Sequence, residues 1–215
     1  MAKPTKTKAR PGWVVPAGLV AVVAALFLVA TVATRVGGDG GAEQADVAQT
    51  RPVSGVGPAL PAFSDQAADP AAGQLAPSVT GATFAGSPVQ IGGTGRPTMV
   101  FFVAHWCPHC RKEVPLLAPA LGRITPPGVD VLTVSTSVRQ GAAGYPPSQW
   151  LQDQGWPATV LADDSDSSAA SAYGLTSFPY YVLLDGAGKV VARDSGEKTV
   201  AEVEALLTQV IPKPG

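Results

Sequence analysis

Residues 103–113 read VAHWCPHCRKE, and the fold and chemistry of the chain depend on this stretch. It holds both cysteines and both histidines of the 215 residues, all within positions 105–110. An apolar run at 98–103, typical of a buried strand, precedes it, and a sequence that favours a helix follows. Strand, tight turn, C-x-x-C and helix in this order predict a redox-active cysteine pair.

Composition narrows the class of protein. Hydrophobic residues make up 46% and charged residues 14%, which is apolar and poor in charge for a soluble domain, so a membrane segment is expected. The net charge of -1 gives no basic excess for binding nucleic acid. A disulfide between two cysteines three positions apart would close too small a loop to stabilise a fold. A chemical role therefore explains the pair better than a stabilising one.

The N-terminal 34 residues resemble a membrane anchor in their charge pattern. Residues 13–34 carry no charge, and about 20 apolar residues suffice to cross a bilayer core as a helix. Trp13 stands at the start of the run, where its ring suits the membrane interface. Residues 1–12 hold four basic side chains against Arg35 alone just after the run, which predicts a cytoplasmic N-terminus. The four are Lys3, Lys6, Lys8 and Arg10.

A cleaved signal peptide is the alternative to this transmembrane signal-anchor. The apolar run is long for a signal peptide, and no clean small-x-small cleavage site follows it. No cysteine follows the run directly, which excludes a bacterial lipoprotein anchor. Whether the segment is cleaved stays open, but both alternatives place the C-x-x-C outside the cytoplasm, where disulfides persist. The expected location is the cell membrane, single-pass, with the main domain extracytoplasmic.

Two further regions follow the anchor. Residues 35–77 are rich in Gly, Ala and Pro without a helical or strand period, which predicts a flexible extracytoplasmic linker. Residues 78–215 show a β-hairpin, alternating strands and helices, a second hairpin and a last helix, which predicts an α/β domain with a mixed central sheet flanked by helices. The expected elements are 81–91, 98–103, 114–121, 129–134, 148–154, 158–161, 163–173, 180–193 and 200–211.

The motif assigns different tasks to its two cysteines. At the start of a helix, Cys107 would face unpaired backbone N–H groups that favour the nucleophilic thiolate. Cys110, one turn later, suits the resolving role of attacking the mixed disulfide. Pro108 costs the helix little stability at the first helical position, because its missing N–H would have no partner within the helix. His109 can donate a hydrogen bond to the thiolate or stabilise its charge. Trp106 offers an apolar surface beside the reactive sulfur.

A metal site is the competing interpretation of the same residues. A C-x-x-C can be half of a zinc site, but two more ligands are then needed. The candidates, His105 and His109, belong to the same short stretch and are poorly placed to join both cysteines around one ion. The sequence therefore predicts no metal, and His105 is interpreted as a partly exposed polar residue.

Trp-Cys-Pro-His-Cys after a buried strand resembles the active site of the thioredoxin superfamily. Pro115 matches the proline that kinks the active-site helix of that fold, and GLTSFP at 174–179 resembles its cis-proline loop. CRKEVP at 110–115 resembles the C-x-x-E-x-P continuation of TlpA/ResA-like proteins, which are membrane-anchored thiol–disulfide oxidoreductases. The resemblance covers about residues 78–212 and implies a thioredoxin-like fold.

The resemblance also implies roles for individual residues. Cys107 and Cys110 would form the redox-active disulfide, and a cis bond between Phe178 and Pro179 would shape the substrate groove. Glu113 matches the family's active-site acid, while Phe101 occupies the position of the buried acid of thioredoxin. Near buried thiols, such a carboxylate should have a raised pKa and could relay a proton. A solvated glutamate on the first helical turns is the alternative.

The direction of electron flow is left open. A reductant, for example for cytochrome c assembly, is the first hypothesis, with protein thiols or disulfides as substrates, a membrane electron-transfer partner and no small-molecule cofactor. The dipeptide Pro108-His109 resembles that of DsbA-type oxidants and favours an oxidant or isomerase, although residues 134–158 leave no room for the DsbA helical insertion. Copper delivery, as in Sco-like proteins, is the third hypothesis, but those use C-x-x-x-C and a distant histidine.

Overall fold

In the computed structural model, residues 47–64 and 69–211 are described. The predicted cytoplasmic segment and membrane anchor at residues 1–34 lie outside these ranges, so both stay predictions. Among the helices of the described ranges, none has the length and apolar character needed to span a bilayer.

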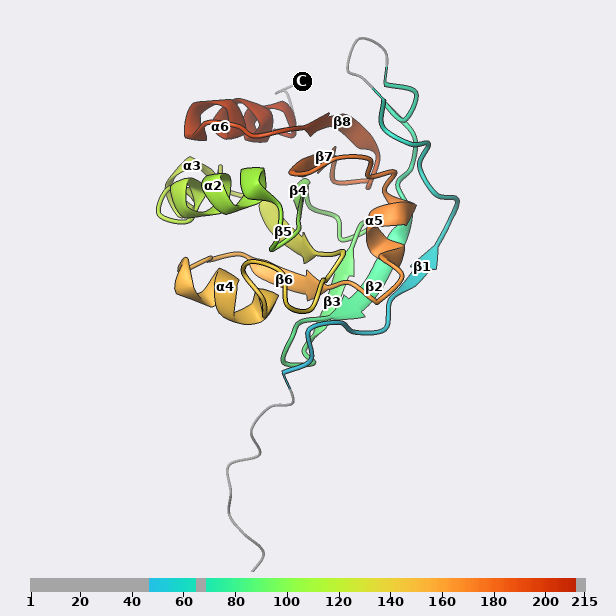
Figure 1. Cartoon of the computed structure of the whole chain (residues 1–215). Coiled ribbons are helices and arrows are strands. Elements are labelled where there is room, and N and C mark those ends of the chain that lie inside the picture. The colour runs from blue at the N-terminus through green and yellow to red at the C-terminus, as the bar shows by residue number, and fades with distance from the viewer. Residues whose placement is uncertain (1–46, 65–68, 212–215) are drawn as a thin grey trace, which may run out of the picture. The chain divides into compact units, whose positions relative to one another are not determined.

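The central strand β4 (Thr98–Val103) organises the sheet, and all six of its residues are buried. It lies between β5, which runs parallel to it, and β7, which runs antiparallel, so the sheet is mixed as predicted. The strand order is β1-β2-β6-β5-β4-β7-β8, with β3 paired to β2 (Figure 1). The other strands are β1 (Ser54–Val56), β2 (Ser78–Ala82), β3 (Pro88–Ile91), β5 (Asp130–Ser135), β6 (Thr159–Ala162), β7 (Tyr180–Leu184) and β8 (Val190–Ser195).

Helices cover both faces of this sheet, and each face has its own core. Successive residues of β4 alternate between the cores, with Phe101 and Val103 in one and Val100 and Phe102 in the other. The first core also holds both cysteines and is covered by α2, α3, α4 and α6, while α5 covers the second (Figure 1). The helices are α2 (Pro108–Leu117), α3 (Leu121–Ile124), α4 (Pro147–Asp153), α5 (Ser168–Ala172) and α6 (Val200–Gln209).

Local patterns in the sequence predicted several elements correctly. The N-terminal hairpin is formed by β2 and β3, and the C-terminal hairpin by β7 and β8, both antiparallel. The spacing of Thr199 and Glu202 in the sequence is that of a capping box, and the last helix has one: the Thr199 side chain accepts from the Glu202 N–H, and the Glu202 carboxylate accepts from the Thr199 N–H. These features depend on residues close together in the chain.

The helix after the motif differs from the expectation. A helix starting at the motif and continuing, with a kink, through residues 114–121 was predicted. The start is confirmed, because α2 begins at Pro108, but α2 ends at Leu117 and the short α3 follows. Pro115 lies inside α2, and Pro119 lies between the two helices. A proline has no N–H to continue the helical ladder, so the second one separates α2 from α3.

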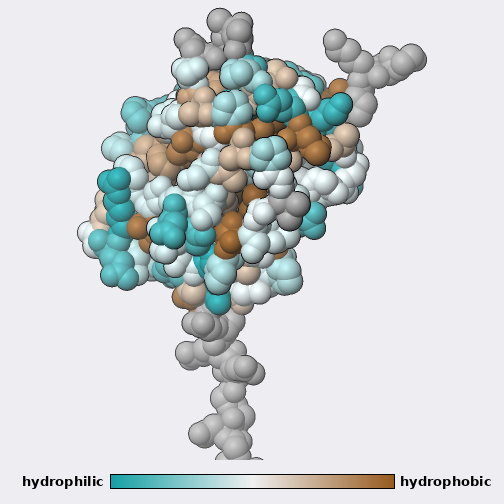
Figure 2. Space-filling model, turned by 90° about the vertical axis from the view of Figure 1, so that its right-hand side faces the viewer, coloured by the Kyte–Doolittle hydropathy of each residue, from teal (hydrophilic) through white to brown (hydrophobic). Residues whose placement is uncertain are grey.

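The predicted flexible linker was wrong for residues 47–64 and 69–77, which pack against the domain. Strand β1 pairs with β2, and Leu60 and Phe63 donate backbone hydrogen bonds of 2.8 Å each to Ala172 and Gly174. Four apolar side chains of the segment are buried in the second core. They are Leu60, Phe63, Ala71 and Ala76. The segment runs along the right-hand side of the domain in Figure 1, and this is the side that faces the viewer in Figure 2. The apolar residues of this segment show no periodic spacing, because the segment is ordered by its contacts with the sheet and α5. Regular secondary structure of its own contributes little.

A buried ion pair fastens this segment to the sheet. The fully buried side chain of Arg193 on β8 binds the Asp69 carboxylate and donates at 2.8 Å to the carbonyl of Pro61. Its guanidinium also lies 5.4 Å from the centre of the Phe63 ring. The Arg193 hydrogen bond is the largest effect on the pKa of Asp69 and lowers it, so the carboxylate stays ionised.

We expect Arg193→Met to lower the free energy of unfolding by about 3–5 kcal/mol, because it leaves a buried carboxylate and buried carbonyls without their partner. Arg96→Met is the matched control, because the Arg96–Asp130 pair is solvent-exposed, with side chains 54% and 38% accessible. That change should cost no more than about 1 kcal/mol. Urea unfolding of both variants checks this, and equal losses would contradict the fastening role of Arg193.

Candidate active site

The cysteine motif lies where the central strand passes into helix α2. Cys107 is the N-cap residue, and Pro108 occupies the first turn, as predicted. The Cys107 N–H donates to the Ala104 carbonyl at 3.0 Å, and its own carbonyl accepts from the Arg111 N–H at 3.0 Å. The sulfur of Cys107 therefore belongs to the helix N-terminus, where the helix dipole and unpaired N–H groups favour a thiolate.

The two cysteines differ in their surroundings. Both are free thiols here, with Cys107 6% exposed and Cys110 0% exposed. Burial raises the pKa of the Cys110 thiol far above its ordinary value, and the nearby Cys107 and Glu113 add to the effect. Cys107, at the helix terminus and with a small part of its surface exposed, is thus better placed as the nucleophile, while the raised pKa keeps Cys110 protonated. The Cys107–Cys110 disulfide stays a prediction for the oxidised form.

The proline loop lies beside the motif, as the sequence predicted. The peptide bond between Phe178 and Pro179 is cis. The Phe178 ring meets the Trp106 ring edge-on, with centroids 5.8 Å apart. Trp106 is fixed further by its indole N–H, which donates to the Ser137 carbonyl at 2.7 Å, and by the Arg139 guanidinium 3.6 Å above its ring. An aromatic pair and a cation therefore border the reactive cysteine.

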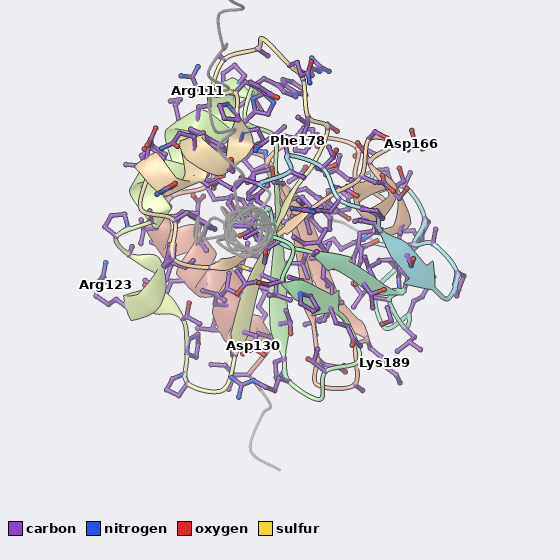
Figure 3. The ribbon with its side chains drawn as sticks, turned by 90° about the horizontal axis from the view of Figure 1, so that it is seen from below. Arg111, Arg123, Asp130, Asp166, Phe178 and Lys189 are labelled. Atoms are coloured by element: carbon purple, nitrogen blue, oxygen red, sulfur yellow. The ribbon has the colours of Figure 1, made fainter. Side chains whose placement is uncertain are left out.

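Figure 3 shows where this border lies in the domain. Phe178 and the exposed Arg111 lie toward one side of the sheet in this view, and Asp130 lies toward the other. This agrees with the pairing of Asp130 with Thr98 at the beginning of β4, since the motif follows the end of that strand. The candidate site therefore occupies the carboxyl end of β4.

Glu113 is completely buried below the motif, so the alternative of a solvated glutamate was wrong. Its Oε1 accepts from the Tyr181 hydroxyl at 2.5 Å and from the Lys198 N–H at 2.7 Å. Its Oε2 is buried without a hydrogen-bond partner. Burial raises the pKa of Glu113 to about 7, outweighing the two hydrogen bonds, which lower it. The carboxyl can therefore exchange a proton near neutral pH.

Tyr181 is a site residue that sequence reasoning missed. It pairs with Phe101 across β4 and β7, and the two rings stack with centroids 4.8 Å apart. Phe101, at the position of the thioredoxin acid, thus contributes packing, and the carboxyl comes from Glu113 on α2. Only the pairing of β4 with β7 brings Tyr181 to Glu113, 68 positions away in sequence. The one local signal was its place two residues after Pro179.

His109 is directed to an acid that the sequence did not single out. Its Nδ1 lies 3.0 Å from Oε2 of Glu197, and no other hydrogen bond of this ring is found among the described residues. Lys112 binds the other oxygen of the same carboxylate at 2.8 Å. Glu197 therefore competes with the Cys107 thiolate for the His109 ring.

His105 is 0% exposed, so its interpretation as a partly exposed residue was wrong. Its Nε2 accepts from the Arg139 N–H at 3.1 Å, which leaves the proton on Nδ1 to donate to the Ala143 carbonyl at 2.9 Å. Burial is the main cause that lowers its pKa, and the charges of Arg139 and Arg111 contribute. A neutral His105 thus fixes the loop that carries Arg139 next to Trp106.

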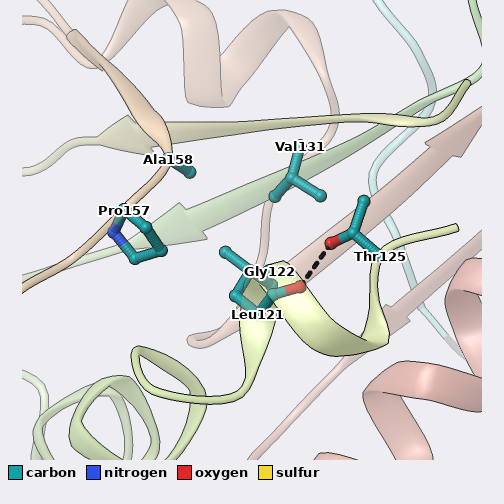
Figure 4. Close-up of a pocket in the computed structure, with 6 residues that line it drawn as sticks. All are labelled: Leu121, Gly122, Thr125, Val131, Pro157 and Ala158. Carbon is teal, nitrogen blue, oxygen red and sulfur yellow. Dashed lines mark hydrogen bonds between the residues drawn. The ribbon is translucent and has the colours of Figure 1, made fainter. Parts of the chain in front are cut away.

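A metal centre and an apolar cavity are the two other kinds of site that the chain could offer. Across residues 47–64 and 69–211, no group of three or more His, Cys, Asp or Glu side chains could hold a metal ion. A cavity of about 320 Å³ lies near the start of β5 and β6 (Figure 4), whereas the cysteines follow the end of the parallel strand β4. Its lining has no ionisable side chain and consists of Leu121, Gly122, Thr125, Val131, Pro157 and Ala158. Neither alternative competes with the cysteine motif.

Known proteins are similar in sequence to more than half of the chain. A thiol:disulfide interchange protein DsbE homolog of Paracoccus denitrificans is 35% identical over 129 residues, covering 58% of this chain and 66% of the relative. The thiol-disulfide oxidoreductase ResA of Bacillus thuringiensis is 25% identical over 118 residues, covering 55% of this chain and 65% of the relative. The matched part thus spans slightly less than two thirds of either relative.

A solved structure and a family model agree with these relatives. The crystal structure described as a thiol:disulfide interchange protein DsbE from Chlorobium tepidum superposes with a TM-score of 0.53 at 26% identity, covering 69% of this chain and 97% of that one. The family model described as Redoxin matches residues 71–207. Since this match covers more than half of the sequence, the chain belongs to the Redoxin family, as a TlpA/ResA-like member of the thioredoxin superfamily.

Proposed function

We propose that the chain is a membrane-anchored thiol–disulfide oxidoreductase that works outside the cytoplasm of a bacterial cell envelope. The observation that carries the proposal is the pairing of Cys107 at a helix N-terminus with a buried Cys110 and a buried carboxyl three residues later. The uncharged run at residues 13–34 and the basic residues before it support the location. The two relatives, named as a thiol:disulfide interchange protein and a thiol-disulfide oxidoreductase, support the reaction class.

In the reducing direction, the reaction has two exchanges. The Cys107 thiolate attacks one sulfur of a substrate disulfide, forming a mixed disulfide and releasing the first substrate thiolate. Cys110 then loses its proton and attacks the Cys107 sulfur, which releases the second substrate thiolate and forms the Cys107–Cys110 disulfide. Two electrons have passed from the enzyme to the substrate. A membrane electron-transfer partner would restore the dithiol.

Glu113 is the group that takes the proton from Cys110. Residues three apart on a helix lie on the same face, and the effect of Glu113 on the pKa of Cys110 agrees with their closeness. Tyr181 and Lys198 both donate to Oε1, so the incoming proton is received at the unpartnered Oε2. A base with a pKa of about 7 suits this transfer at neutral pH.

The substrates are protein disulfides or dithiols that lie across the proline loop. The aromatic border of Trp106 and Phe178 supplies apolar contact beside Cys107. The backbone next to Pro179 can pair with an extended substrate strand. These features favour polypeptide over a small thiol as the substrate.

An oxidant of secreted proteins is the second candidate function, and His109 favours it. A histidine between the two cysteines can stabilise the thiolate, and stabilising the reduced form makes the disulfide a stronger oxidant. The reduction potential of the Cys107–Cys110 pair separates the two functions. We expect a value nearer to about −270 mV than to about −120 mV, and equilibration with glutathione measures it. A value near about −120 mV would assign the oxidant function.

Cys107→Ala should reduce insulin-disulfide reduction to the uncatalysed rate, because the nucleophile is lost. Cys110→Ala should instead accumulate a mixed disulfide through Cys107, which non-reducing electrophoresis and mass spectrometry detect. Full activity of the first variant would remove the enzyme proposal. A mixed disulfide trapped on Cys110 in Cys107→Ala, with none trapped on Cys107 in Cys110→Ala, would reverse the two roles.

Glu113→Gln should slow resolution of the mixed disulfide by about 100-fold at neutral pH, because the proton acceptor is removed while Oε1 keeps its donors. Stopped-flow measurement of the second exchange checks this. Glu204→Gln on the exposed side of α6 is the control and should leave the rate unchanged. An unchanged rate in Glu113→Gln would contradict the proton transfer.

Glu113 also makes stability depend on pH. Its pKa rises from 4.5 to about 7 on folding, so the folded state holds the proton more tightly. The resulting stabilisation is complete below pH 4.5 and is lost as the pH rises through about 7, a difference of about 3 kcal/mol. Urea unfolding across this range should show the loss in the wild type and not in Glu113→Gln. Parallel pH profiles in both proteins would contradict the raised pKa.

A further inference from the structure

The turn between β8 and α6 provides one acid that binds the outer surface of the motif. Glu197 lies in this turn, and its carboxylate contacts two side chains of α2, His109 and Lys112. Oε2 lies 3.0 Å from Nδ1 of His109, and Oε1 lies 2.8 Å from Nζ of Lys112. The two contacts hold one carboxylate against the helix that begins at the nucleophile.

These contacts occupy the His109 ring. His109 is exposed, with 61% of its side chain accessible, so core packing does not fix its direction. In the part of the chain that the structure describes, Glu197 is the one hydrogen-bond partner of the ring, and no bond from the ring to a cysteine sulfur occurs. The residue that favours an oxidant is therefore bound to a carboxylate.

We propose that Glu197 is a positioning residue that withholds His109 from the Cys107 thiolate and so makes the Cys107–Cys110 pair less oxidising. This inference rests on the proposed function, and it favours the reducing over the oxidising direction of electron flow. Bound to Glu197, Nδ1 of the ring is engaged by a carboxylate instead of the sulfur, and the positive charge of the protonated ring is balanced. Both effects destabilise the thiolate form and favour the disulfide.

Lys112 helps to keep the acid ionised and in place. Its hydrogen bond is the largest cause that lowers the pKa of Glu197, and the bond from His109 is the next. The lowered pKa keeps Glu197 in its carboxylate form at neutral pH. The exposed position of the contacts also makes them sensitive to salt, because ions screen exposed charges within about 10 Å at 0.1 M ionic strength.

The test measures the equilibrium between the protein and glutathione. One protein disulfide and two glutathione thiols give one protein dithiol and one glutathione disulfide, so atoms and electrons balance. In the full-length chain in mild detergent, Glu197→Gln should shift this equilibrium toward the dithiol by about threefold to tenfold, or ~15–30 mV. Thiolate absorbance should show Cys107 titrating at lower pH in the variant.

Asp130→Asn is the matched control, because it removes an exposed carboxylate that binds Arg96 near the opposite end of β4. It should leave the equilibrium and the thiolate titration unchanged. Raising the ionic strength should move the wild type toward the value of Glu197→Gln and leave that variant nearly constant. No shift in Glu197→Gln, or a shift toward the disulfide, would overturn the proposal.

A double substitution tests whether the effect passes through His109. In a His109→Ser background, Glu197→Gln should change the equilibrium by less than twofold. A shift that persists there at full size would show that Glu197 acts by its own charge alone, which would overturn the withholding of His109. If the wild type failed to exchange with glutathione at all, the proposed function would fall, while the thiolate titration would still decide the role of Glu197.

Discussion

The hydrogen bond from the Tyr181 hydroxyl to the buried carboxyl of Glu113 connects the fold with its chemistry. It can form only because β4 and β7 pair and because α2 packs over that face of the sheet. A carboxyl in this core needs such a donor, since burial without hydrogen bonds is costly. The arrangement leaves one carboxyl oxygen unpartnered, so the acid is held in place and can still receive a proton.

The turn at residues 196–199 contacts the active site in two places, one in the core and one at the surface. The backbone N–H of Lys198 points inward to Glu113, while the side chain of Glu197 points outward to His109 and Lys112. The inner contact affects the proton transfer of the resolving cysteine. The outer contact affects how strongly the nucleophile is stabilised as a thiolate. One short segment far from the cysteines in sequence thus influences both exchanges.

The segment before residue 78 completes the opposite face of the sheet. Its composition suggested a linker, yet its apolar side chains enter the second core, and Arg193 binds Asp69 across 124 positions of sequence. Such a segment has no periodic pattern because it forms almost no regular structure of its own. Its order comes from surfaces that exist only once the sheet and α5 have assembled.

The sequence by itself determined the features that depend on neighbours in the chain. These include the strand, the C-x-x-C at a helix start, both hairpins and the capping box, while the proline loop and the choice of Glu113 as the acid came from the resemblance to known proteins. Tertiary structure alone decided that Tyr181 binds this acid, that His105 is buried and that Glu197 binds His109. Those contacts join residues up to 88 positions apart, and periodicity and capping carry no information over such separations.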